Sequence, residues 1–185
     1  MNPSDIVLLA LEAMGGPVQG KTLAQKRLYF MAVLAGYEDA LDYRPHYYGP
    51  YSAVVADAVG QNVSLGFVRQ ERTAYGAADP RGFEVARTDY ALTRDGREVA
   101  HWMASQDPEV RRKLEAAWRR IYEAGDLDYM TLSVAAKIHH LLPKNGVPVR
   151  PEDLRESARC IGWELPADGI EKAVRFLQAL AFVKI

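Results

Sequence analysis

The spacing of apolar side chains predicts helices over most of the chain. Within residues 22–35, apolar positions recur every three to four residues in two adjacent rows, which is typical of a helix buried on most sides. The same spacing predicts further helices at about 4–14, 52–65, 93–102, 108–124, 131–142, 151–161 and 168–181. Residues suited to capping lie at or near several of these starts: Ser4, Thr22, Ser52, Thr93, Asp107 and Thr131.

Two extended segments interrupt the helical pattern. Residues 67–75 and 83–92 flank a loop from Gly76 to Gly82, which predicts a β-hairpin. Residues 182–185 show a short extended apolar pattern at the end of the chain. The pattern as a whole predicts an α+β protein that is mostly helical.

The order of these elements predicts three blocks. Three helices followed by a hairpin form the order of a winged helix-turn-helix, which we expect over residues 1–92. Bridging helices follow over 93–127. Residues 128–185 then form a C-terminal helical block of helix-turn-helix type without a wing, and we expect all three blocks to make one compact unit.

Composition narrows the class of protein further. The 185 residues include 23 Lys and Arg and 24 Asp and Glu, so the formal net charge is −1, and 49% are hydrophobic. This is ordinary for a globular protein and gives no charge-based case for nucleic acid. Residues 1–92 hold 8 basic and 10 acidic side chains, so the acidic excess lies in the block expected to resemble a DNA-binding fold.

Single residue types exclude other classes. Cys160 is the only cysteine, so an intrachain disulfide and a thiolate metal cluster are excluded. No apolar run is long enough to span a bilayer, and no basic flank precedes an apolar leader, so we expect a cytoplasmic protein. His139 and His140 are neighbours on one helix and point about 100° apart, so they cannot hold one metal together, and no metal site or cofactor is predicted.

Residues 15–22 match the phosphate-loop pattern G-x-x-x-x-G-K-[ST]. In such a loop, backbone N–H groups hold the phosphates, the lysine contacts phosphate and the Ser or Thr hydroxyl binds magnesium. Lys21 and Thr22 stand at these last two positions. The other interpretation is a glycine-rich linker between two helices. We favour the linker, because the chain lacks alternating strands and helices and because the β-branched Val18 resists a left-handed loop backbone. Nucleotide binding at Gly20, Lys21 and Thr22 therefore ranks third among the functions considered.

Two segments carry a family resemblance. Residues 21–30 (KTLAQKRLYF) and 46–52 (HYYGPYS) resemble the prokaryotic winged-helix family that includes the Panacea antitoxin domain (SocA-type) and YwgA-like proteins. Residues 132–141 and Gly162-Trp163 resemble the second half of the YwgA-like group, whereas Ala24 stands where the family usually has Leu. The resemblance implies either neutralisation of a toxin protein or DNA-binding regulation, and it brings no catalytic residues.

A DNA-binding first block would use its third helix and its hairpin. Helix 52–65 would enter the major groove, where Gln61 and Asn62 could pair with adenine. Tyr51 and Ser52 would contact phosphate at the start of that helix. The hairpin would contribute four arginines that reach the DNA backbone or minor groove: Arg69, Arg72, Arg81 and Arg87.

The tyrosine-rich turn is the alternative binding surface. Tyrosines offer large, rigid contact area with a polar tip, so His46, Tyr47, Tyr48 and Tyr51 are candidates for holding a partner protein. These four side chains and Tyr43 could instead pack the turn against helix 22–35, and we expect most of the five to do so.

The leading hypothesis is a non-enzymatic winged-helix regulator that binds duplex DNA. The second is an antitoxin-like module that holds a partner protein, and the third is nucleotide binding at Gly15 to Thr22. A homodimer is compatible with the first two.

Overall fold

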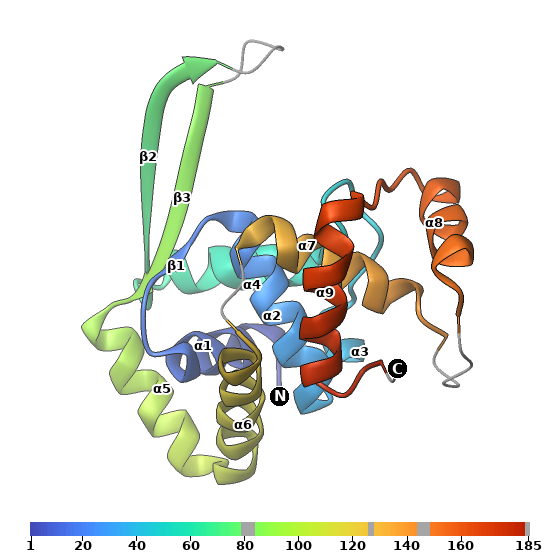
Figure 1. The fold of residues 1–185 in the computed structure, drawn as a ribbon. Coiled ribbons are helices and arrows are strands. Elements are labelled where there is room, and N and C mark those ends of the chain that lie inside the picture. Colours follow the sequence, from blue (N-terminus) through green and yellow to red (C-terminus); the bar gives the residue numbers. More distant parts are fainter. Residues whose placement is uncertain (79–83, 126–127, 144–148, 184–185) are drawn as a thin grey trace.

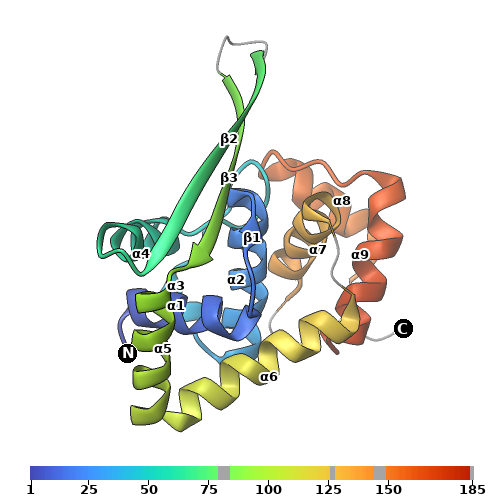
Figure 2. The same cartoon turned by 90° about the vertical axis from the view of Figure 1, so that its left-hand side faces the viewer.

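The structure is a computed structural model that describes residues 1–78, 84–125, 128–143 and 149–183 (Figures 1 and 2). It is an α+β fold that is mostly helical, as predicted. The elements in chain order are α1 (Pro3–Met14), β1 (Val18–Gln19), α2 (Lys21–Ala35), α3 (Glu38–Leu41), α4 (Ala53–Ser64), β2 (Val68–Ala78), β3 (Glu84–Leu92), α5 (Arg94–Gln106), α6 (Pro108–Ala124), α7 (Tyr129–Leu141), α8 (Pro151–Cys160) and α9 (Ala167–Ala179).

Several predicted helix boundaries shift by one to three residues. Asn2 caps α1 in place of the expected Ser4, because its side chain accepts a hydrogen bond from the Asp5 amide at 2.9 Å. Asp128 caps α7 by accepting from the amides of Met130 and Thr131, so this helix begins before the predicted Thr131. Those amides and the Thr131 hydroxyl hold the pKa of Asp128 below its usual range. The short helix α3 was not predicted.

The sheet contains the predicted hairpin and one further strand. The hairpin strands β2 and β3 pair antiparallel, starting with Val68 opposite Leu92 at the base of the hairpin. On the other side of β3, β1 pairs with it antiparallel, with Val18 opposite Tyr90 and Gln19 opposite Asp89. The strand order is therefore β1-β3-β2. β1 was missed because two residues cannot show an alternating pattern. The hairpin rises well clear of the helices (Figure 1). Phe182 and Val183 form no strand, contrary to the expectation for residues 182–185, of which 184 and 185 lie outside the described residues.

Helix α2 lies at the centre of the core. Its side chains include Leu28, Tyr29, Phe30 and Met31, each at most 1% exposed, which confirms a helix buried on most sides. It packs against α1, α6 and α7, while α6 runs from α5 toward the C-terminal helices (Figure 2). One cluster of buried apolar residues extends from α1 to α9. The three ranges predicted as blocks therefore share a common core.

Gly96 allows α5 to start directly against the base of the hairpin. A Cβ at Gly96 would lie 2.0 Å from the Phe67 carbonyl oxygen, whereas a Cβ at Gly60 of α4 would meet no atom within 4 Å. We expect Gly96→Ala to lower the free energy of unfolding by about 1–3 kcal/mol, since the backbone of Phe67 must shift. Urea denaturation followed by circular dichroism measures the change.

Gly60→Ala is the matched control for that substitution. Because Gly60 lies in a helix with open space around it, alanine should raise the free energy of unfolding by about 0.5–1 kcal/mol. Equal effects of the two substitutions would contradict the close contact between α5 and the hairpin.

Candidate functional site

Buried side chains of α2 hold the segment that leads into α4. The Gln25 amide forms two hydrogen bonds with the backbone of Ser52: Nε2 donates to its carbonyl at 2.9 Å, and Oε1 accepts from its amide at 3.1 Å. Lys26 Nζ donates to the Pro50 carbonyl at 2.5 Å. Tyr43 is also buried, and its hydroxyl donates to the Gln25 carbonyl at 3.4 Å. The Gln-Lys pair of α2 thus fixes the Gly-Pro-Tyr-Ser turn from inside the protein.

Two of the residues expected to contact DNA are structural. Ser52 is 0% exposed: its hydroxyl donates to the Leu41 carbonyl and accepts from the Val55 amide as the cap of α4. Asn62 is 2% exposed, and its amide nitrogen donates to Ser4 and to the Ala58 carbonyl, which ties α4 to α1. Neither side chain reaches the surface, so we correct the expectation that Ser52 binds phosphate and that Asn62 pairs with a base.

The tyrosine-rich turn has a buried part and an exposed part. Backbone bonds between Arg44 and Tyr51 close it, and the Tyr51 ring packs half-buried against His46. At the tip, Tyr47 and Tyr48 are 72% and 51% exposed. His46 is exposed as well, whereas Tyr51 is half-buried and Tyr43 is buried. The expectation that most of these side chains pack against α2 is therefore wrong.

Gly49 lets the same turn lie against α7. Its φ is +95°, and a Cβ there would lie 3.2 Å from the Ser133 carbonyl oxygen and 3.1 Å from the side chain of Lys137. The turn also touches the C-terminal block, because Trp163 Nε1 donates to the His46 carbonyl at 2.6 Å. The turn therefore joins the two halves of the chain.

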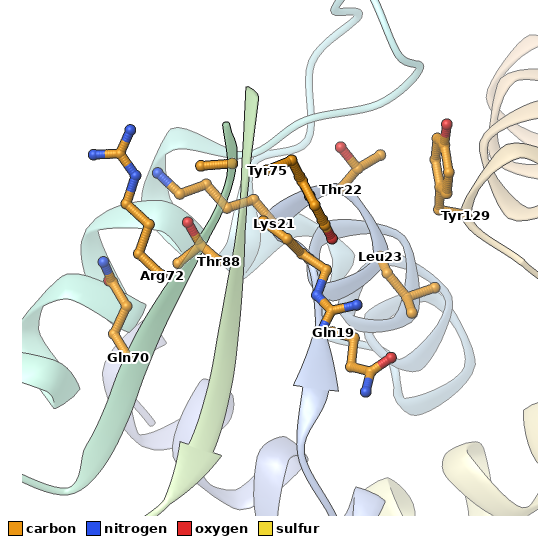
Figure 3. Close-up of a pocket in the computed structure, with 12 residues that line it drawn as sticks. Gln19, Lys21, Thr22, Leu23, Gln70, Arg72, Tyr75, Thr88 and Tyr129 are labelled. Carbon is orange, nitrogen blue, oxygen red and sulfur yellow. The ribbon is translucent and has the colours of Figure 1, made fainter. Parts of the chain in front are cut away.

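A pocket of about 740 Å³ lies where β1 gives way to α2, beside the edge of β3; we call it the hairpin pocket. Figure 3 shows Gln70 and Arg72 on β2, Lys21 at the start of α2 and Tyr129 on α7 around it. Arg87 of β3 also lines it. Among the described residues that line the hairpin pocket, three are basic and none is acidic.

The start of α2 adds to the positive character of the hairpin pocket. Its N-cap residue is Gly20, which offers no side chain to the first-turn amides. Amides at an uncapped helix start attract anions. Lys21 is exposed there, and Thr22 is half-buried.

Two of the hairpin arginines are paired with carboxylates. Arg69 pairs with Glu71 at 2.9 Å on the exposed hairpin. Arg87 pairs with Asp89 at 2.9 Å, which raises the pKa of the guanidinium. Arg72 lies on the strand face that carries Gln70 toward the hairpin pocket. The fourth predicted arginine, Arg81, lies outside the described residues.

The geometry of residues 15–22 disfavours a phosphate loop. Val18 and Gln19 are paired in β1, so their backbone does not curl into a ring of N–H groups. The Gly20 amide donates to the Thr88 carbonyl and to the Asp89 carboxylate at 3.0 Å. A carboxylate thus occupies the position where a phosphate oxygen would accept, although Lys21 and Thr22 do begin a helix.

The exposed face of α4 carries mostly small side chains and only one charge. Gln61 is exposed there and is the predicted base-contacting residue that remains available. Asp57 is the only charged residue of α4, and it is exposed. Ala53, Gly60 and Ser64 complete this face.

The chain was compared with known proteins: no family model matches it, and no curated protein matches it significantly. Within the part of the chain that the structure describes, no three His, Cys, Asp or Glu side chains gather as they would around a metal ion. None of the described helices is long and apolar enough to cross a membrane.

Sequence reasoning missed the residues that the fold brings to these surfaces from far away. Lys137 and Trp163 lie against the turn at 46–49, although each is about a hundred residues away from that turn in the chain. No local pattern links such positions. At Lys21 the sequence indicated only the phosphate-loop pattern. It did not show that Arg72 and Arg87 lie nearby, because their position depends on the pairing of β1 with the hairpin.

Lys26 makes the stability of this turn depend on pH. Its side chain is 2% exposed, and burial together with the charge of Lys137 lowers its pKa to about 8. Between pH 8 and 10.5 the unfolded chain retains a proton that the folded protein has released, so stability should rise with pH. The free energy of unfolding of wild type minus that of Lys26→Met should increase there by up to about 1.4 kcal/mol per pH unit.

Urea denaturation at several pH values measures this difference. Buried tyrosines, whose raised pKa values oppose the trend at the alkaline end, affect both proteins and cancel. Lys21→Met removes an exposed lysine from the same helix, and its profile should run parallel to that of wild type. A wild type–Lys26→Met difference that stays constant with pH would show that Lys26 is charged in the folded protein throughout.

Proposed function

We propose that the protein is a non-enzymatic regulator of the winged-helix class that binds duplex DNA through the hairpin, the start of α2 and the exposed face of α4. The observation that carries this proposal is the hairpin pocket, where Lys21, Arg72 and Arg87 converge with no acidic lining residue among those described, although Asp89 already pairs with Arg87 and accepts from the Gly20 amide. Phosphate groups are the anions that such a surface suits.

The order of the elements supports the proposal. A short strand between the first two helices pairs with the second hairpin strand, and a helix leads directly into the first hairpin strand. That order is typical of winged helices, in which the hairpin is the wing and the preceding helix enters the major groove. Here α4 adjoins β2, and α2 begins beside β1, so the hairpin stands between them (Figure 2).

The composition of α4 suggests how it would lie on DNA. Small side chains at Ala53, Gly60 and Ser64 allow close approach to the groove, and Gln61 is the group able to pair with adenine. Asp57 would oppose binding by repulsion from phosphate. Affinity would therefore come mainly from the basic residues around the hairpin pocket, with weak discrimination between sequences.

A second candidate function is the binding of a partner protein. Two observations favour it: Tyr47 and Tyr48 are exposed at the tip of the turn, and Arg69 and Arg87 are already paired with carboxylates. The paired arginines offer less to phosphate than four free ones would.

Removing cations from the hairpin pocket should weaken DNA binding and its dependence on salt. Lys21→Ala and Arg72→Ala should each lower the affinity for a duplex of about 30 base pairs by about tenfold at about 50 mM salt, since each removes a charge-assisted phosphate contact. Each should also reduce the slope of log K against log salt by about 1. Fluorescence anisotropy with a labelled duplex measures both.

Arg119→Ala on α6 is the control, because this arginine is exposed on a helix that lies away from the hairpin (Figure 2). Its affinity and slope should match those of wild type. If wild type retards no duplex at low salt, the DNA proposal fails.

Asp57 provides a test in the opposite direction. If α4 faces the DNA, Asp57→Asn removes a repulsive charge and should tighten duplex binding by about two- to fivefold. The same anisotropy titration at low salt measures it, with Glu123→Gln on α6 as the control. No change at Asp57 would place α4 outside the interface.

A further inference from the structure

A second pocket, of about 840 Å³, separates the tip of the tyrosine-rich turn from the C-terminal helices. Its walls are the turn at 47–48, one face of α7, the inner face of α8 and the segment 162–166. We call it the interblock cleft. It shares no lining residue with the hairpin pocket.

The floor of the interblock cleft is apolar and firmly held. Trp163 and Val134 line it at 2% and 4% exposure, with half-buried Leu165 beside them. Trp163 is fixed at both ends, because its indole nitrogen donates to the His46 carbonyl while its ring packs edge-on against His140. Because Trp163 and Val134 are already almost fully buried, an apolar group that contacts them would bury mainly the surface of Leu165 and of the rim.

The rim exposes large side chains of the kinds that protein interfaces favour. Tyr47, Tyr48 and Met130 are 72%, 51% and 50% exposed, and the two tyrosine rings stack edge to face at 4.8 Å. Tyrosine, methionine and arginine are enriched at protein interfaces relative to the rest of the surface. A partner that covers this rim would remove apolar surface from water.

The charge of the interblock cleft is positive. Lys137, Arg155 and Arg159 line it, against the single carboxylate of Glu164. Arg155 and Arg159 are four residues apart on α8 and so lie on one face, where like charges repel. Among the described residues, neither arginine has an ion pair with a carboxylate. Lys137 is bound within the cleft, since Nζ donates to the Glu164 carbonyl at 3.3 Å and lies 5.9 Å from the Trp163 ring centroid.

We propose that the interblock cleft binds an acidic segment of a partner protein that carries an apolar anchor residue. The anchor would sit on Trp163 and Val134, and flanking carboxylates would pair with Arg155 and Arg159, whose planar groups suit carboxylates. Charge complementarity selects this occupant over a neutral peptide. The exposed tyrosines and methionine favour a protein over a nucleic acid, because phosphate contacts need no apolar floor.

The binding of a model peptide to the full-length protein tests the proposal. The probe is a fluorescein-labelled peptide with a central Phe-Leu pair and three glutamates on each side. We expect saturable anisotropy with a Kd of roughly 1–100 µM. Arg155→Glu and Arg159→Glu should each weaken binding by about tenfold or more, and Tyr48→Ala should weaken it by about threefold to tenfold.

Matched controls separate this site from general attraction. Arg119→Glu makes the same charge change on α6 and should leave the Kd unchanged. A peptide with lysines in place of the glutamates should not bind, and a peptide with Ala-Ala in place of Phe-Leu should bind at least about fivefold more weakly. Arg155 and Arg159 are exposed, so neither substitution should disturb the fold. The circular dichroism spectra of both variants should match that of wild type.

Several outcomes would overturn the proposal. These are no saturable binding of the acidic peptide, equal binding of the Ala-Ala peptide, or equal weakening by Arg119→Glu. Binding of a labelled single-stranded oligonucleotide or of ADP that is lost in Arg155→Glu, without binding of the peptide, would assign the interblock cleft to nucleic acid or to a small anion instead. Since the duplex titrations use other residues, failure here would leave the DNA proposal standing.

Discussion

The hydrogen bonds from Gln25 and Lys26 of α2 to the backbone of Pro50 and Ser52 are the contacts on which the arrangement of both surfaces depends. A chain crossing the protein interior must have its backbone polar groups satisfied, and these two side chains do this for a segment that belongs to neither a helix nor a sheet. Once residues 50–52 are fixed, Ser52 caps α4 and so sets where that helix begins. The Pro50 carbonyl accepts from the buried Lys26 nitrogen, and the lowered pKa of Lys26 reflects the cost of burying its charge.

The same segment places two surfaces of different character. On the side of the hairpin, α4 and the start of α2 are held around the base of the sheet, with Lys21 and Arg72 beside one pocket. On the side of the C-terminal helices, Gly49 lies against Ser133 of α7, and Tyr47 and Tyr48 are presented next to Trp163. A regulator that binds DNA through one surface and a partner through the other would connect both through α2 and this turn.

The near-zero net charge is compatible with two binding surfaces because the charges are not evenly distributed. Hairpin carboxylates neutralise Arg69 and Arg87, and Asp57 makes the exposed face of α4 slightly acidic. Among the described residues, Lys21 at the start of α2 and Arg155 and Arg159 on α8 have no ion pair with a carboxylate and line one or other pocket. Since phosphate contacts provide most DNA affinity, the number of such cations limits how tightly this protein could hold a duplex. The interblock cleft depends less on charge, because it also offers an apolar floor.

Helical periodicity, capping residues and the interrupted hairpin pattern determined the fold class and nearly every helix, because these signals are local. They also indicated α2 as the buried helix. The short elements β1 and α3 could not be predicted, because so few residues cannot show the alternation of a strand or the 3.6-residue spacing of a helix. Only the tertiary structure decided that Ser52 and Asn62 are buried and that Lys21 faces the hairpin arginines. It alone brought Trp163, Arg155 and Arg159 to the turn at 46–49, because contacts between residues about a hundred positions apart arise from packing around a shared core, which no local pattern encodes.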